Sequence, residues 1–212
     1  MKYNMPVIVL VTSGRDVLIA QGGKWLADED TSVFPLQRIT GVPDTPGRRR
    51  AKQEATRRAE TLGPDVKFTP LERKSGPDRF STRFVVPGNP PGFLKGTFPD
   101  PKYPDESPVE AAIREVKEET GYDIRPFKIV PKSSNVFLVD IPPERKQDIL
   151  QSWRAMGREG ELVDLRWEPI PDIRSDIRLL NTESQPAVQY LPLKAGTRRR
   201  KRKVYKSRKQ KR

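Results

Sequence analysis

The stretch that decides the fold reads Glu106-Ser-Pro-Val-Glu-Ala-Ala-Ile-Arg-Glu-Val-Lys-Glu-Glu-Thr-Gly-Tyr122. Its small and apolar residues recur with the period of an α-helix and can pack on a core. Ser107 suits the N-cap, and Gly121 suits the left-handed residue that ends a helix. Three carboxylates at positions i, i+3 and i+4 share another side of this helix: Glu115, Glu118 and Glu119.

This acidic face predicts a metal site. Like charges on neighbouring turns repel one another, so the cluster is unfavourable unless something neutralises it. Hard divalent cations take oxygen ligands, and Mg²⁺ often works together with substrate phosphates. The helix is therefore predicted to belong to a metal-dependent site that acts on phosphate.

The same stretch resembles the Nudix hydrolase motif, in which a glutamate and seven residues precede Arg-Glu-apolar-x-Glu-Glu-x-Gly-apolar. The resemblance implies an α+β fold, an α/β/α sandwich around a mixed β-sheet, and Mg²⁺ or Mn²⁺ held by the three glutamates. It also implies that Arg114 orients the glutamates, that Glu106 ties the preceding loop to the helix and that Gly121 is structural. One feature differs: the opening glycine, Gly96, lies ten residues before Glu106 instead of six, which lengthens this loop.

Composition excludes several classes of site. The 212 residues include 22 prolines, 34% hydrophobic residues and no cysteine or histidine, and the mean hydropathy is −0.74. Disulfides, Ser–His or Cys–His nucleophiles and histidine-bound zinc are therefore excluded. The longest apolar run, residues 7–11, is too short to span a bilayer. We expect a soluble intracellular protein, cytoplasmic or nuclear, with no membrane partner.

The net charge of +13 is concentrated at the C-terminus, where residues 198–212 contain eleven Lys/Arg and no acid. The remainder carries 41 − 11 = 30 basic against 28 acidic residues. We expect a Nudix domain over residues 1–194 and a disordered basic tail over 195–212. The tail is predicted to bind RNA phosphates, to direct nuclear import or simply to aid solubility. The RNA-binding candidates are Arg198, Arg199, Arg200, Lys201, Arg202 and Lys203.

Local patterns give the expected order of elements, and the long interval before the motif indicates a loop-rich insertion over residues 21–79. We expect a hairpin of strands 6–11 and 16–20, loop over 21–47, helix 48–62, strand 80–86, loop over 87–105, strands 122–130 and 135–140, helix 142–156, strand 161–170 and a short helix over 171–180. Helix 48–62 carries a basic cluster, which is a second candidate for RNA contact: Arg48, Arg49, Arg50, Lys52, Arg57 and Arg58.

The loop before the motif narrows the resemblance. Residues 92–96 read Gly-Phe-Leu-Lys-Gly and, with the motif, resemble the catalytic subunit of the mRNA-decapping enzyme and its viral analogues, although Leu94 replaces a proline. This resemblance implies that Phe93, Lys95 and Gly96 contact substrate. Lys95 is equally readable as an ordinary loop lysine.

The resemblance also implies a further carboxylate in a loop, which acts as general base or extra ligand. Glu159, Glu161 and Asp164 are candidates, with Glu161 favoured, and each is alternatively a surface charge. Trp25, Phe93 and Trp167 are candidates for stacking on a base, or else core residues.

Three functions follow. The first is hydrolysis of the 5′ cap of mRNA, which releases 7-methylguanosine diphosphate. The second is hydrolysis of a small anionic diphosphate, such as a nucleotide or a diphosphoinositol polyphosphate. The third is a catalytically silent Nudix fold that binds RNA.

Overall fold

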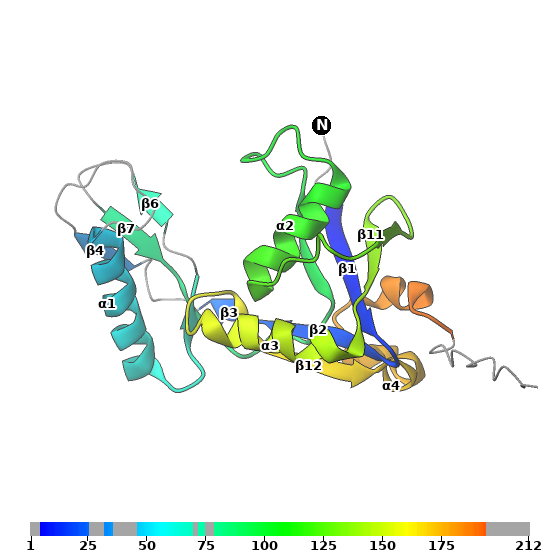
Figure 1. The fold of residues 1–212 in the computed structure, drawn as a ribbon. Coiled ribbons are helices and arrows are strands. Elements are labelled where there is room, and N and C mark those ends of the chain that lie inside the picture. The colour runs from blue at the N-terminus through cyan, green and yellow to red at the C-terminus, as the bar shows by residue number, and fades with distance from the viewer. Residues whose placement is uncertain (1–4, 26–31, 36–45, 70–71, 75–78, 194–212) are drawn as a thin grey trace, which may run out of the picture.

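The computed structural model describes residues 5–25, 32–35, 46–69, 72–74 and 79–193 (Figure 1). The predicted tail and its six candidate residues lie outside these ranges. No helix in the described part of the chain is long and apolar enough to cross a membrane.

A six-stranded mixed sheet forms the centre of the molecule. Its order is β10-β11-β1-β2-β12, and β9 also pairs with β1. Strand β1 is parallel to β11 on one side. On its other side it is antiparallel first to β9, which pairs with residues 5–9, and then to β2, which pairs with residues 12–13. The strands are β1 (Met5–Ser13), β2 (Asp16–Gly22), β9 (Leu94–Phe98), β10 (Ile129–Pro131), β11 (Val136–Asp140) and β12 (Leu162–Pro169).

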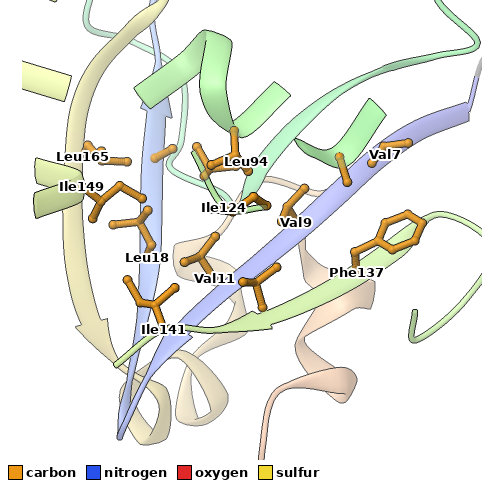
Figure 2. Packing of buried hydrophobic residues seen from close by; sticks show 14 of the residues in the cluster. Val7, Val9, Val11, Leu18, Leu94, Ile124, Phe137, Ile141, Ile149 and Leu165 are labelled. Atoms are coloured by element: carbon orange, nitrogen blue, oxygen red, sulfur yellow. The ribbon is translucent and has the colours of Figure 1, made fainter. Parts of the chain in front are cut away.

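Helical layers cover both faces of this sheet. Alternate residues of β1 point to opposite faces, and Val7, Val9 and Val11 pack under α2 (Pro108–Thr120) and α3 (Lys146–Ala155) (Figure 2). Ile8 and Leu10 pack on the other face against α4 (Ile170–Ser175) and η3 (Gln185–Tyr190). Two further 3₁₀ turns are η1 (Pro143–Arg145) and η2 (Ile177–Leu179). The predicted α+β class is confirmed.

The segment predicted as an insertion, residues 21–79, shares a small core with residues 80–86 that follow it. Helix α1 (Pro46–Leu62) packs Ala51, Ala55 and Ala59 against Phe68 and Phe84. Figure 1 shows α1 lying beside the main sheet rather than on it. Two three-stranded sheets, β3-β8-β5 and β4-β7-β6, complete this unit. Their strands are β3 (Lys24–Trp25), β4 (Ser32–Pro35), β5 (Lys67–Phe68), β6 (Glu72–Lys74), β7 (Arg79–Thr82) and β8 (Phe84–Val86).

Several local predictions are wrong. The expected loop over 21–47 contains β3 and β4, and the expected loop over 87–105 contains β9. The expected strand 80–86 is two strands in different sheets, and that over 122–130 shrinks to β10. Short strands owe their existence to partners distant in sequence, which local periodicity does not register. The hairpin of β1 and β2 and the helices α1, α2 and α3 are confirmed.

Candidate active site

Helix α2 is fixed at both ends by its own sequence. The Ser107 side chain accepts a hydrogen bond from Glu110 N, and the Glu110 carboxylate accepts one from Ser107 N, which is a complete capping box. Gly121 ends the helix at a φ of 71°, where glycine carries no Cβ penalty. These local bonds set where the acidic face begins and ends.

Arg114 is the centre of the acidic cluster. Its Nε donates to Glu106 Oε1 at 2.9 Å, and its Nη1 donates to Glu115 Oε1 at 2.6 Å and to Glu118 Oε2 at 3.0 Å. Its Nη2 donates to the carbonyl of Thr97 at 3.3 Å. Burial disfavours its charge, but the bonds to Glu106 and Glu115 outweigh this and raise the pKa of Arg114. The guanidinium therefore joins α2, β9 and the intervening loop.

Glu115 lies directly against strand β9. A Cβ added to Gly96 would stand 1.6 Å from the Cδ of Glu115, so glycine alone allows this approach. Glu115 is buried, and this burial raises the pKa of its carboxyl despite Arg114 and a backbone hydrogen bond from Thr97. The carboxylate is thus seated against the strand.

Glu119 is partly buried as a residue, but one of its carboxylate oxygens is fully enclosed. Its Oε2 is buried and has no hydrogen-bond partner in the described part of the structure. Burial, and then the charges of Glu115 and Glu161, raise the pKa of Glu119 well above its ordinary value, while the backbone of Lys95 lowers it. Glu115 of α2 and Glu161, just before β12, therefore both act electrostatically on Glu119.

These residues suit a hard cation, although their side chains do not encircle one. Among the described residues no group of three or more acidic side chains is arranged to hold a metal ion. Instead Arg114 Nη1 supplies the positive charge between Glu115 and Glu118. The donor set is nevertheless all oxygen, and Glu119 Oε2 is a buried acceptor without a donor. A divalent cation would accept these oxygen ligands and would give Glu119 Oε2 a partner, so the residues fit the predicted metal.

Two of the three predicted substrate contacts lie at this cluster. Gly96 faces Glu115, and the ammonium of Lys95 is close enough to Glu119 to lower its pKa, while pairing with Glu183. Phe93 is different: its side chain is 2% exposed and lies in the core on the other face of the sheet. A ring enclosed in this way offers no surface to a base, so the structure does not support the predicted contact.

The three candidates for a further carboxylate are separated by the structure. Glu161 acts electrostatically on Glu119, and its predicted role as general base or extra ligand stays a prediction. Glu159 pairs with Arg48 and Lys52, and Asp164 pairs with Arg166, so both are engaged elsewhere. Trp167 donates from Nε1 to the carbonyl of Lys146 and packs against the core, whereas the side chain of Trp25 lies outside the described part.

The basic cluster of α1 does not form one open cationic surface. Arg48 and Lys52 are held by Glu159, Arg57 pairs with Glu54, and Arg58 lies over the ring of Phe84. Arg49 and Arg50 are exposed. The structure therefore uses four of the six residues of this cluster for internal contacts.

Sequence reasoning missed two residues of the lengthened loop. Asp100 Oδ2 lies 3.9 Å from Arg114 Nη1, and the ring of Tyr103 lies under the Arg114 guanidinium at 5.0 Å from Cζ to the ring centroid. Tyr103 is 43% exposed. The extra length of the loop is the sequence signal that points to them.

Comparison with known proteins agrees with this geometry. Residues 89–191, just under half of the chain, match the NUDIX domain. An RNA pyrophosphohydrolase of Bartonella tribocorum is 38% identical over 76 residues, which are 32% of this chain and 43% of that protein. The chain thus spans less than half the length of this relative. The domain match, the sandwich fold and the capped acidic helix together identify residues 89–191 as a Nudix domain.

Proposed function

We propose that this chain is a metal-dependent Nudix pyrophosphohydrolase that acts on the 5′ end of RNA, with the mRNA cap as its substrate. The observation that carries the proposal is the contact between α2 and β9, where Gly96 leaves room for the carboxylate of Glu115. A solvated acidic helix would need no such recess. The resemblance of the RNA pyrophosphohydrolase supports an RNA 5′ end as substrate.

Each side chain has a proposed task. Glu115, Glu118 and Glu119 would hold Mg²⁺ or Mn²⁺, which when bound polarises phosphoryl oxygens and lowers the pKa of an attacking water. Arg114 keeps Glu106 and Glu115 in place through its Nε and Nη1. Glu161 would accept the proton of the attacking water at a carboxylate oxygen. The Lys95 ammonium would pair with a substrate phosphate after leaving Glu183.

A second candidate is a small anionic diphosphate, because the cluster itself contains nothing that demands a polymer. The basic tail favours RNA over this candidate, since eleven Lys/Arg follow residue 197. Paired phosphates and Lys/Arg add affinity that does not depend on sequence. A silent RNA-binding fold is disfavoured because the set of carboxylates is complete.

Product analysis tests the proposal. Capped RNA, 5′-triphosphate RNA, nucleoside di- and triphosphates and a diphosphoinositol polyphosphate are incubated separately with the protein and Mg²⁺ or Mn²⁺. We expect release of 7-methylguanosine diphosphate and 5′-monophosphate RNA from capped RNA. Turnover of the small diphosphates alone would establish the second candidate, and no turnover of any substrate would reject hydrolysis.

A further inference from the structure

Residues 158–161, here called the Glu161 loop, connect α3 to β12 and are held by the insertion through backbone bonds. Phe68 N donates to the carbonyl of Arg158 at 2.9 Å, and Gly160 N donates to the carbonyl of Phe68 at 2.8 Å. Gly23 N donates to the carbonyl of Glu161 at 2.9 Å. Phe68 of β5 and Gly23, which directly precedes β3, therefore hold both ends of a loop that belongs to the Nudix domain.

Side chains add a second set of bonds. Glu159 Oε2 lies 2.5 Å from Lys52 Nζ, and its Oε1 lies 3.4 Å from Arg48 Nη2. Arg158 Nη1 donates to the carbonyls of Gly63 and Val66 at 3.1 and 2.8 Å. The Glu159 side chain is only 13% exposed, so its carboxylate is the shielded member of the two pairs, while Arg48 and Lys52 are 38% and 48% exposed.

The sequence of the loop restricts its own backbone little, so contacts from outside have to fix it. Gly157 and Gly160 flank Glu159 with φ of 67° and 147°, conformations that glycine adopts without the steric penalty of other residues. Figure 1 shows the connection after α3 turning toward the side of the molecule that carries α1. Loop residues perform precise chemistry only when a rigid scaffold fixes them.

We propose that the insertion is a positioning clamp: Glu159, locked between Arg48 and Lys52, fixes the Glu161 loop so that the Glu161 carboxylate faces the acidic cluster of α2. Glu159 is a positioning residue, since it acts through Glu161 and touches no reacting atom. The inference rests on the proposed function, because it assigns Glu161 a role in hydrolysis. It gives the insertion a task other than RNA binding.

A double-mutant cycle tests the clamp with a capped dinucleotide, which is too short to reach distant basic residues. Glu159→Gln removes the charge and keeps the volume, and we expect kcat to fall about tenfold with KM unchanged, in line with the cost of misplacing a catalytic group. In a Glu161→Gln background the same change should have no further effect. Equal loss in both backgrounds, or no loss in either, overturns the proposal.

Two further variants separate positioning from general damage. Glu159→Asp keeps the charge and should recover part of the lost kcat, and Lys52→Gln should reproduce the Glu159→Gln defect from the other side. Glu54→Gln is the matched control, because it removes an exposed ion pair of the same helix that contacts no part of the Glu161 loop. A tenfold loss in this control as well would overturn the clamp.

Hydrogen exchange distinguishes failure of the clamp from failure of the proposed function. Peptides over residues 157–163 should exchange faster in Glu159→Gln than in the unmodified protein, while peptides over 108–120 remain the same. If the unmodified protein hydrolyses none of the substrates, the proposed function is wrong and the exchange result alone decides the clamp. Unchanged exchange at 157–163 overturns it.

Discussion

Gly96 and Glu115 are in such close contact that the carboxylate occupies the place of a side chain on the strand. Gly96→Ala should therefore push Glu115 out of position, because the added methyl would overlap Cδ and both oxygens. We expect a loss of about 1–3 kcal/mol in the free energy of unfolding and about 100-fold in kcat. Urea denaturation and initial rates measure the two effects.

Gly22→Ala provides the matched control, since a Cβ there would meet only Asn89 Nδ2 at 4.0 Å. This variant should keep activity and stability near those of the unmodified protein. An active Gly96→Ala protein would show that the recess is unnecessary for hydrolysis.

Glu118→Gln should lower kcat by at least about 100-fold, because a proposed ligand loses its charge and little volume. The side chain is 51% exposed, so the fold should persist with an unchanged melting temperature. Binding of capped RNA, followed by fluorescence anisotropy, should also be retained. Glu144→Gln, an exposed change in η1, serves as the control, and full activity in Glu118→Gln would refute the assigned site.

Arg114→Lys should damage the site although the charge is kept. A lysine ammonium cannot reproduce the fork that joins Glu106, Glu115 and the Thr97 carbonyl. We expect affinity for Mn²⁺ to fall about 10- to 100-fold, as it does when groups that orient metal ligands are lost. Titration followed by electron paramagnetic resonance measures this, with Arg125→Lys at an exposed ion pair as the control. Equal Mn²⁺ affinity in both variants would contradict the role given to Arg114.

Lys67 makes stability depend on pH. Burial lowers the pKa of Lys67 to about 8, and its ammonium lies 4.1 Å from the centroid of the Trp153 ring. The unfolded chain has the ordinary value of about 10.4, so between these values it binds more protons than the folded protein. The free energy of unfolding should therefore rise as pH increases from about 8 to about 10.4. This gain in stability should be lost again as pH falls through about 8, where the buried Lys67 becomes charged. Lys67→Met should flatten the rise relative to Lys128→Met in urea titrations; parallel curves would show that the pKa is ordinary.

Deletion of residues 197–212 should weaken binding of long capped RNA and spare a capped dinucleotide. Each tail contact with a phosphate of single-stranded RNA adds about 0.7 to the slope of log affinity against log salt concentration. Binding titrations at several salt concentrations should therefore give a shallower slope after deletion. An unchanged slope would mean that the tail serves localisation or solubility.

The sequence predicted α2 in detail because its signals are local. Ser107, Glu110 and Gly121 act within one helix, and Arg114 lies one turn or less from Glu115 and Glu118. Glu161 was favoured through family resemblance rather than through any local pattern. The sequence does not predict the pairing of Glu159 with Arg48, because 111 positions separate these two residues.

Strand β9 was missed for a related reason. Its residues lie in a stretch rich in proline and glycine, and pairing with β1 across some 90 positions makes it a strand. Without β9, three further features were not predicted either. These are the backbone contacts to Glu115 and Glu119, the placement of Phe93 in the core and the approach of Asp100 to Arg114.

The contact between β9 and α2 also covers the edge of a strand. Among the described strands β9 pairs only with β1, so its outer border is a free edge onto which a foreign strand could add. The Lys95 and Thr97 amides on that border are instead taken by carboxylates of α2. Alanine at Glu115 and Glu119 would leave these two amides without acceptors and open the strand edge to pairing with another chain. Glutamine at the same positions keeps a side-chain oxygen that can accept from them, so the edge would stay covered.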